Sequence, residues 1–275
     1  MKNSDLHTHS YYSDGLFSPT QVVRKAKENR VKNLALTDHN SFEGIKEAQK
    51  EAKKQGINLI SGIELRCKEG EVLGYFIDFK NKEFAKKVKI IKDRSREVFE
   101  NTVKELNKRG INVKSREVLD TKLKRDNPLI AHLFKFLKNK NLISIKEMKE
   151  FMKGDLFEPH FSTEEIIKMI NGARGVAVLS HPWYSKTFLD DARMEELIRA
   201  GLKGIEIDNG GISKERASSL DKINKFAEKY KLILTSGSDY HGDFTLMSSE
   251  HKLGASNCDE KVVEQLKVFV RKGYL

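Results

Sequence analysis

The 275-residue sequence is poor in cysteine and contains no long apolar segment. Its two cysteines, Cys67 and Cys258, lie far apart and fit no metal-ligand spacing, as expected where no disulfide framework is needed. No apolar run approaches the length of a membrane span, and the first residues lack the apolar stretch of a signal peptide. These absences predict a cytoplasmic protein that makes no contact with a membrane.

Glycine-rich nucleotide-binding fingerprints are missing as well. Neither G-x-G-x-x-G after a predicted strand nor G-x-x-x-x-G-K-S/T occurs, which argues against a dinucleotide site or a Walker site. The composition, 38% hydrophobic and 33% charged, is that of a globular protein, and the length allows one large α/β domain or a main domain with an insertion.

Acidic residues are too few to balance the basic ones, which leaves a formal net charge of +11. A basic protein attracts phosphates generally. Most of the basic residues are lysines that stand beside glutamates in helix-like segments, as in Lys27-Glu28 and Lys46-Glu47, and this pattern is typical of a solvated surface. We therefore favour a solvated surface over a dedicated nucleic-acid face, and expect the charge to favour a phosphate-bearing substrate.

Strand-like and helix-like segments alternate in both end regions of the chain. The predicted strands span residues 3–7, 31–37, 57–63, 71–78, 175–180, 204–208 and 231–236. Such alternation predicts right-handed βαβ units and a parallel sheet, either a seven-stranded TIM-like barrel or an open doubly wound sheet. Residues 80–159 show only helical patterns. We predict an α/β barrel from 1–79 and 160–275, with 80–159 as a helical insertion.

Metal-binding residue types recur where the predicted strands end. His7 and His9 lie two positions apart at the end of the first strand, so their side chains point to the same side. The other strand ends carry Asp38, His39, Glu64, His181, Asp208, Asp239 and His241. In a parallel barrel these side chains would converge on one rim, which predicts a metal site. The remaining histidines, His132, His160 and His251, are assigned to surface or core roles.

The composition of this set restricts the chemistry. Histidine and carboxylate ligands without thiolate suit Zn, Mn or Fe, and a carboxylate between two ions can bridge them. Two or three clustered ions generate hydroxide from water near neutral pH and neutralise phosphate oxygens. The set therefore predicts hydrolysis, and it leaves open the metal and the oligomeric state.

Six segments carry the set in chain order. They are Asp5-Leu6-His7-Thr8-His9-Ser10, Ser13-Asp14-Gly15, Thr37-Asp38-His39-Asn40, Gly62-Ile63-Glu64, Ser180-His181-Pro182 and Gly237-Ser238-Asp239-Tyr240-His241-Gly242. This series resembles the PHP (polymerase and histidinol phosphatase) family of metal-dependent phosphoesterases. The helical middle resembles the insertion in the branch that contains nucleoside 3′,5′-bisphosphate phosphatases and an RNA 5′-end exonuclease. The resemblance implies a distorted (β/α)7 barrel with up to three ions.

The resemblance also implies a role for each matching residue. One ion would be held by His7, His9, Glu64 and Asp239. Glu64 would bridge it to a second ion, held also by His181, and a third ion would be held by Asp14, His39 and His241. Asp239, His241 and His181 are assigned a catalytic role, and Asp38 is expected to orient a neighbouring histidine.

Two positions depart from the family pattern. Glu71 stands where relatives commonly carry a histidine ligand, and we predict that it too is a metal ligand, with an altered charge and metal preference. Leu129, in Asn127-Pro128-Leu129-Ile130-Ala131, replaces a histidine of the insertion. Arg66, Arg125 and Lys186 are the predicted phosphate-binding residues.

Three functions are consistent with these residues. The leading hypothesis is a phosphomonoesterase in which metal-activated hydroxide attacks the phosphorus of a small phosphorylated metabolite or nucleotide. One alternative is a nuclease that acts on nucleic-acid ends, which the net charge motivates. The other is a non-catalytic module that binds metal or nucleotide, which Glu71 and Leu129 motivate. Barrels that hydrolyse C–N bonds often use a lysine ligand, and this set has none.

Overall fold

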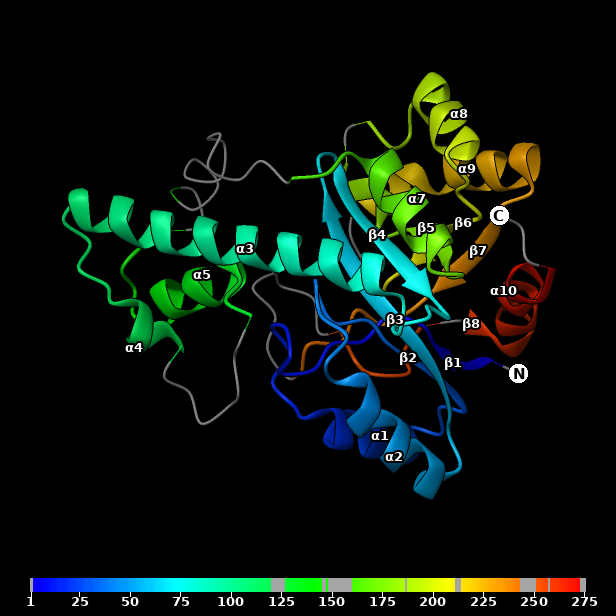
Figure 1. Ribbon diagram of the computed structural model, residues 1–275, viewed down its shortest axis with the longest axis horizontal. Coiled ribbons are helices and arrows are strands. Elements are labelled where there is room, and N and C mark those ends of the chain that lie inside the picture. The colour runs from blue at the N-terminus through cyan, green and yellow to red at the C-terminus, as the bar shows by residue number, and fades with distance from the viewer. Residues whose placement is uncertain are drawn as a thin grey trace.

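A central sheet organises the fold (Figure 1), seen in a computed structural model that describes residues 2–119, 127–144, 147, 160–185, 187–210, 214–242, 251–256 and 258–272. Its strands are β1 (Lys2–Asp5), β2 (Asn33–Leu36), β3 (Asn58–Cys67), β4 (Gly70–Tyr75), β5 (Val176–Leu179), β6 (Gly204–Asp208), β7 (Ile233–Ser236) and β8 (Cys258–Asp259). They lie in the order β7-β6-β5-β4-β3-β2-β1-β8. The predicted fold class, an α/β barrel, is confirmed.

The alternation of strands and helices predicted a parallel sheet. The observed sheet departs from this prediction at β4. Strands β1 to β3 are mutually parallel and so are β5 to β7, but β4 runs antiparallel to β3 and to β5. The reason is that β3 continues past Glu64 to Cys67 and turns back over two residues into β4. So short a connection cannot cross the sheet, so the chain must reverse. Glu71 consequently lies near the start of β4, beside the end of β3 that carries Glu64.

The end of β1 meets the segment around β7, which nearly closes the sheet into a barrel. The backbone N–H of Leu6 donates to Ser236 O at 3.2 Å, and that of His9 donates to Tyr240 O at 2.9 Å. Thr8 and Tyr240 form a parallel bridge there. On its other side β1 pairs with the short antiparallel strand β8. The first and last parts of the barrel therefore lie side by side at the rim that carries His7 and His9.

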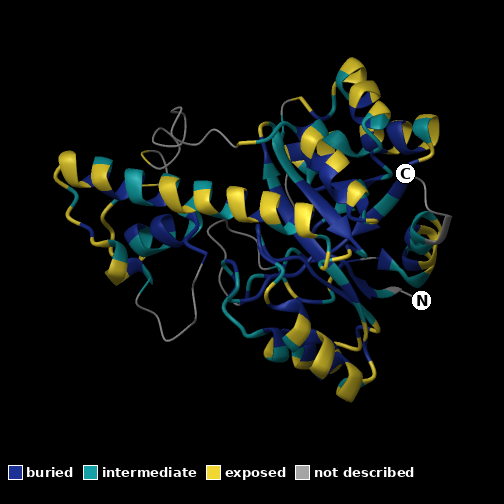
Figure 2. Ribbon diagram, viewed as in Figure 1, coloured by how far each residue is buried: buried dark blue, intermediate teal, exposed yellow. Residues whose placement is uncertain are grey.

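Apolar side chains fill the barrel, and helices cover its outside. The inner cluster includes Leu6, Leu73, Tyr75 and Val178, and the Tyr75 hydroxyl donates to Leu6 O at 2.9 Å. The covering helices are α1 (Pro19–Glu28), α2 (Ile45–Gln55), α7 (Thr163–Gly172), α8 (Asp191–Arg199), α9 (Lys214–Tyr230) and α10 (Glu260–Lys272), with a 3-10 turn η2 at Pro182–Tyr184. Figure 2 shows buried strands inside and exposed residues on the outer faces of these helices. None of the described helices is both long and apolar enough to span a bilayer.

The predicted insertion contains three described helices, α3 (Lys82–Lys108), α4 (Ser115–Leu119) and α5 (Ile130–Asn139). The first part of α3 packs Phe84 and Val88 into the core of the barrel domain. Its second part extends away from the barrel and packs Phe99 and Leu106 against Leu133 of α5 (Figure 1). Within the insertion, residues 144–152 also have a helical pattern in the sequence, and most of them lie outside the described residues. The exact boundaries 80–159 stay a prediction.

Candidate metal centre

Five histidines and four carboxylates meet at one end of the barrel among the residues that the structure describes. They are His7, His9, Asp14, His39, Glu64, Glu71, His181, Asp239 and His241. They come from segments that follow β1, β2, β5 and β7, from the turn at Asp14, and from the β3–β4 hairpin. Every metal ligand that the sequence predicted is therefore part of this cluster.

Glu64 lies at the centre and is fully buried. Its Oε2 is 3.1 Å from His7 Nε2, 3.1 Å from His39 Nδ1 and 3.4 Å from His9 Nε2. Its Oε1 is 3.2 Å from His181 Nε2 and accepts a hydrogen bond from the Ser180 hydroxyl at 2.5 Å. One carboxylate thus contacts histidines from three different strand ends, as a bridging ligand must.

The other two predicted carboxylates each join a pair of histidines. Asp239 Oδ1 is 3.3 Å from His9 Nε2 and 3.4 Å from His7 Nε2. Asp14 Oδ1 is 3.1 Å from His241 Nε2 and 3.8 Å from His39 Nε2. The ligand atoms of His9, Asp14, His39 and His241 form one compact group, and those of His7, His9 and Asp239 form another. These groups agree with the first and third ion positions that the resemblance implied.

Electrostatics within the cluster favour charge on both partners. Burial opposes ionisation of Glu64, but His7 and His39 outweigh it and hold the pKa of that carboxyl well below its usual range. Burial also disfavours the charged form of His181, yet the hydrogen bond and charge of Glu64 raise its pKa to about 9. His9 differs, because burial and the neighbouring His241 and His39 lower its pKa to about 3. Glu64 is therefore anionic, and His181 compensates this charge by binding a proton.

This donor set fits divalent metal ions. His9 Nε2 and Asp14 Oδ1 are buried without a well-aligned hydrogen bond, although both face the cluster. Buried polar atoms are nearly always satisfied, so such atoms call for a ligand. Imidazole nitrogens and carboxylate oxygens are the donors that Zn, Mn and Fe accept.

Two ligand segments have strained backbones. His181 has φ of 23° and Asp239 has φ of 51°, in the region that non-glycine residues rarely adopt. Each is fastened by a buried carboxylate, since His181 N donates to Glu206 Oε2 at 2.7 Å and the neighbouring Ser238 N donates to Asp5 Oδ1 at 2.7 Å. Strain of this kind persists where the surroundings hold the backbone in place, as they do at functional sites.

Sequence reasoning also placed Asp208 among the strand-end side chains that converge on this rim, without assigning it to an ion. Asp208 instead contacts Arg216 Nη1 at 2.5 Å. The residue it missed is Glu206 on the same strand, whose Oε1 lies 3.0 Å from His7 Nδ1. Glu206 fixes the orientation of His7, as carboxylates beside metal-binding histidines commonly do. A charged residue in the middle of a buried strand was the signal that could have revealed it.

Asp38 contacts serines, and it reaches a histidine only through the Ser13 hydroxyl, which lies 3.4 Å from His9 Nδ1. It accepts hydrogen bonds from Ser10 N at 2.6 Å, from the Ser10 hydroxyl at 2.7 Å and from the Ser13 hydroxyl at 2.8 Å. It thereby stabilises the turn that carries Asp14. Among the histidines assigned elsewhere, His132 is buried and contacts Ser13 O at 3.0 Å, while His251 Nδ1 lies 4.0 Å from Asp239 Oδ2.

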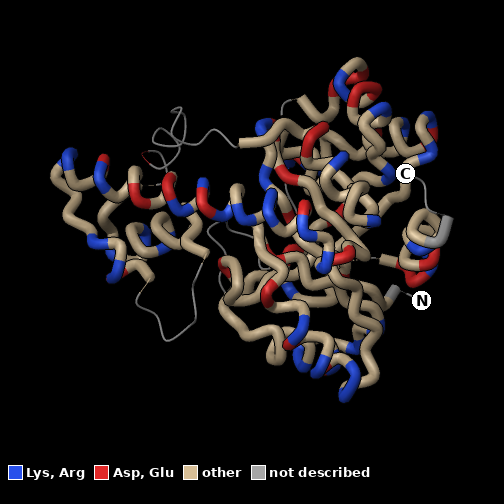
Figure 3. The backbone as a smooth tube through the Cα atoms, in the orientation of Figure 1, with Lys and Arg blue, Asp and Glu red and all other residues tan. Residues whose placement is uncertain are grey.

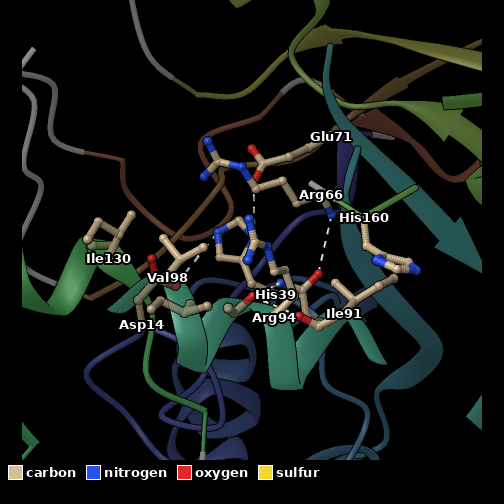
Figure 4. A pocket seen from close by; sticks show the side chains of 13 residues that line it. Asp14, His39, Arg66, Glu71, Ile91, Arg94, Val98, Ile130 and His160 are labelled. Carbon is tan, nitrogen blue, oxygen red and sulfur yellow. Dashed lines mark hydrogen bonds and ion pairs between the residues drawn. The ribbon is translucent and has the colours of Figure 1, made fainter. Parts of the chain in front are cut away.

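A pocket opens beside the cluster, between the barrel rim and the helices α3 and α5. Asp14, His39 and Glu71 reach it from the cluster, together with Arg66 (Figure 4). The other lining residues include Ile91, Arg94 and Val98 of α3 and the segment Leu129-Ile130-Ala131. Arg66 therefore lines the pocket beside the cluster, and its role in binding phosphate stays a prediction. Arg125 and Lys186 lie outside the described residues.

Comparison with known proteins identifies the family. A family model of the PHP domain matches residues 5–275, so the chain belongs to the PHP domain family. A 3′,5′-nucleoside bisphosphate phosphatase of Chromobacterium violaceum is 30% identical over 264 residues, which cover 88% of both chains. A 5′-3′ exoribonuclease of Haemophilus influenzae is 50% identical, but over 64 residues that cover only 23% of each chain.

Solved structures agree on the fold. A proposed metal-dependent phosphoesterase from Bifidobacterium adolescentis has a TM-score of 0.81 at 22% identity, covering 96% of this chain and 95% of that one. A protein from Chromobacterium violaceum, described as an amidohydrolase with bound sulfate and no metal, also has a TM-score of 0.81, at 25% identity over 97% of this chain and 96% of that one. The expected family, fold and enzyme class, a metal-dependent phosphoesterase, are confirmed.

Proposed function

We propose that the protein is a cytoplasmic phosphomonoesterase that acts on a small phosphorylated metabolite or nucleotide with two or three Mn, Zn or Fe ions. The observation that carries this proposal is the cluster of five histidines and four carboxylates beside a pocket that Arg66 also lines. Ions bound there would activate water near neutral pH and neutralise the oxygens of the phosphate.

The protein supplies the positions of the ions and of the substrate. Glu64 contacts histidines of all three ligand groups and would keep the ions at fixed separations. Asp239, His241 and His181 lie at the rim with Asp14, only partly buried, where they can face both the ions and the phosphate. Arg66 would hold phosphate oxygens through its planar guanidinium, which can donate two parallel hydrogen bonds.

The pocket also indicates what carries the phosphate. Arg66 and Arg94 are two cations on one pocket, and Ile91, Val98 and Ile130 add an apolar wall (Figure 4). A substrate with an apolar ring and more than one phosphate group would match such a lining, with the ring on the apolar wall and the phosphates at the arginines. This agrees with the substrate class in the name of the phosphatase from C. violaceum, and the sulfate in the related structure is a tetrahedral anion like phosphate.

A panel of phosphate esters tests the proposal. Protein loaded with Mn or Zn should release phosphate from a nucleoside 3′,5′-bisphosphate faster than from a mononucleotide or a simple alkyl phosphate. Asp239→Asn, which removes a carboxylate that contacts His7 and His9, serves as the inactive control. Metal-loaded protein that releases phosphate from none of these esters would contradict the proposal.

A nuclease acting on nucleic-acid ends remains the second candidate, because of the +11 charge and the segment similar to an exoribonuclease. Lysines and arginines are interleaved with acidic residues along α3 and the outer helices in the view of Figure 3, which favours the small substrate. Activity on oligonucleotides that falls steeply with salt, and exceeds the activity on mononucleotides, would support the nuclease instead.

A further inference from the structure

Glu71 faces two different histidines with its two carboxylate oxygens. Its Oε1 is 3.4 Å from His39 Nδ1, and its Oε2 is 3.4 Å from His181 Nε2. Glu64 spans the same two histidines, with Oε2 at 3.1 Å from His39 Nδ1 and Oε1 at 3.2 Å from His181 Nε2. Two carboxylates thus stand side by side between one pair of imidazoles.

The β3–β4 hairpin creates this arrangement. Arg66 pairs directly with Glu71 across the hairpin, and directly opposite residues point to the same side of an antiparallel pair. Glu64 precedes Arg66 by two positions, so it points to that side as well. Glu64 is fully buried, whereas the Glu71 side chain is 21% exposed and lines the pocket. Glu64 is therefore the inner carboxylate and Glu71 the outer one, which faces the pocket.

We propose that Glu71 is a second bridging carboxylate, which would join the ion held by His181 to the ion held by His39, in addition to the bridge that Glu64 would form. This proposal rests on the proposed metal-dependent function. A histidine at position 71 could offer one nitrogen to one ion, because its second ring nitrogen points the other way and carries the proton. A carboxylate offers two oxygens and one more negative charge.

The second bridge also changes which metal the centre prefers. With Glu64 and Glu71 beside His181, an ion bound there would have mainly carboxylate oxygens as protein ligands. Carboxylate oxygens suit Mn, whereas imidazole nitrogens suit Zn. Glu71 therefore shifts the preference of this position towards Mn and ties its affinity to that of the ion beside His39.

Metal binding, measured without substrate, tests the proposal. We would titrate the metal-free wild type, Glu71→Gln and Glu71→His with Mn²⁺, count bound ions by elemental analysis and follow free and exchange-coupled Mn²⁺ by electron paramagnetic resonance. Glu69→Gln is the matched control, because it removes a carboxylate from the same hairpin that pairs with Arg193 outside the cluster. Circular dichroism of each metal-free protein checks that it is folded.

The expected result is that Glu71→Gln weakens the binding of two ions at once, each by about tenfold or more. Glu71→His should restore only one of them, weaken the exchange coupling between the two ions, and move the Mn/Zn competition by about tenfold towards Zn. Glu69→Gln should behave like the wild type.

Three results would overturn the proposal. If only one ion is weakened in Glu71→Gln, Glu71 binds a single ion and does not bridge. If no ion is weakened while the wild type binds two or more, Glu71 is not a ligand and the phosphoesterase proposal stands unaffected. If the wild type binds no ion at all, both proposals fall.

Discussion

The two ends of the barrel interior are lined by the same strands but have opposite character. On β4, Glu71, Leu73 and Tyr75 point to one side, yet the first reaches the ligand cluster while the other two belong to the apolar core. On β3, Ile60 belongs to that core and Glu64 to the cluster. Along each strand, the apolar core and the ligand cluster are only one or two inward-facing positions apart. The packed apolar end can therefore hold the ligand residues of the charged end in place.

The largest effect is expected from Glu64→Gln at the charged end. The change removes the central negative charge that contacts His7, His39 and His181. Phosphatase activity should fall more than about a hundredfold with loss of bound metal, because even supporting residues of metal sites cost ten- to a hundredfold. Elemental analysis measures the bound metal, and steady-state kinetics measure the activity. Full activity in this variant would show that Glu64 is not an essential metal ligand.

Leu73→Ala tests the apolar end in the same way. Leu73 is fully buried, so the cavity should lower the free energy of unfolding by about 2–5 kcal/mol, measured by chemical denaturation. The number of bound ions should stay that of the wild type if the two ends are independent in function. Loss of metal in the folded variant would show instead that packing sets the ligand positions.

Glu206→Gln lies on the boundary between the two ends. It keeps the shape but removes the charge beside His7 Nδ1 and His181 N, and should weaken metal binding by about tenfold. Isothermal titration with Mn²⁺ checks this value. Unchanged affinity would mean that the contact to His7 is structural only.

The charged end should also give the metal-free protein a pH dependence of its own. The pKa of His181 is raised to about 9 and that of His241 to about 10, so their stabilising protons are retained at neutral pH. This stabilisation is complete below the ordinary histidine pKa near 6.5 and is lost as pH rises through the range from 9 to 10. The melting temperature of the metal-free protein should therefore fall by several degrees between pH 7 and 10. A flat profile would contradict these shifts.

The smallest effect is expected from Asp208→Asn. This residue ends β6 but contacts Arg216 near the surface, and partly exposed ion pairs contribute about 0–1 kcal/mol. Activity and metal content should equal those of the wild type. A large loss of activity or of bound metal would show that Asp208 takes part in the site.

The ligand types could be predicted from the sequence, because strand ends of a barrel converge and the histidines and carboxylates stood at those ends. Glu206 was missed although its charge within a strand was a signal, because a carboxylate inside a strand reaches the site only if it points inward, and the buried residues of β6 conceal that direction. The antiparallel direction of β4 was missed because the predicted third strand ended at residue 63, four residues before β3 ends at Cys67. The contact of Asp208 was not predicted either, because its partner Arg216 comes from the following helix.

The contacts that bring the end of β1 beside β7 have a consequence for how the molecule holds together. His7 and His9 lie on one side of this seam, and Asp239 and His241 lie on the other. An ion bound by residues from both sides would hold the two ends of the barrel together as well as take part in the reaction. Because ligands this far apart in the chain meet only once the last strand is in place, metal binding would be coupled to the final step of folding.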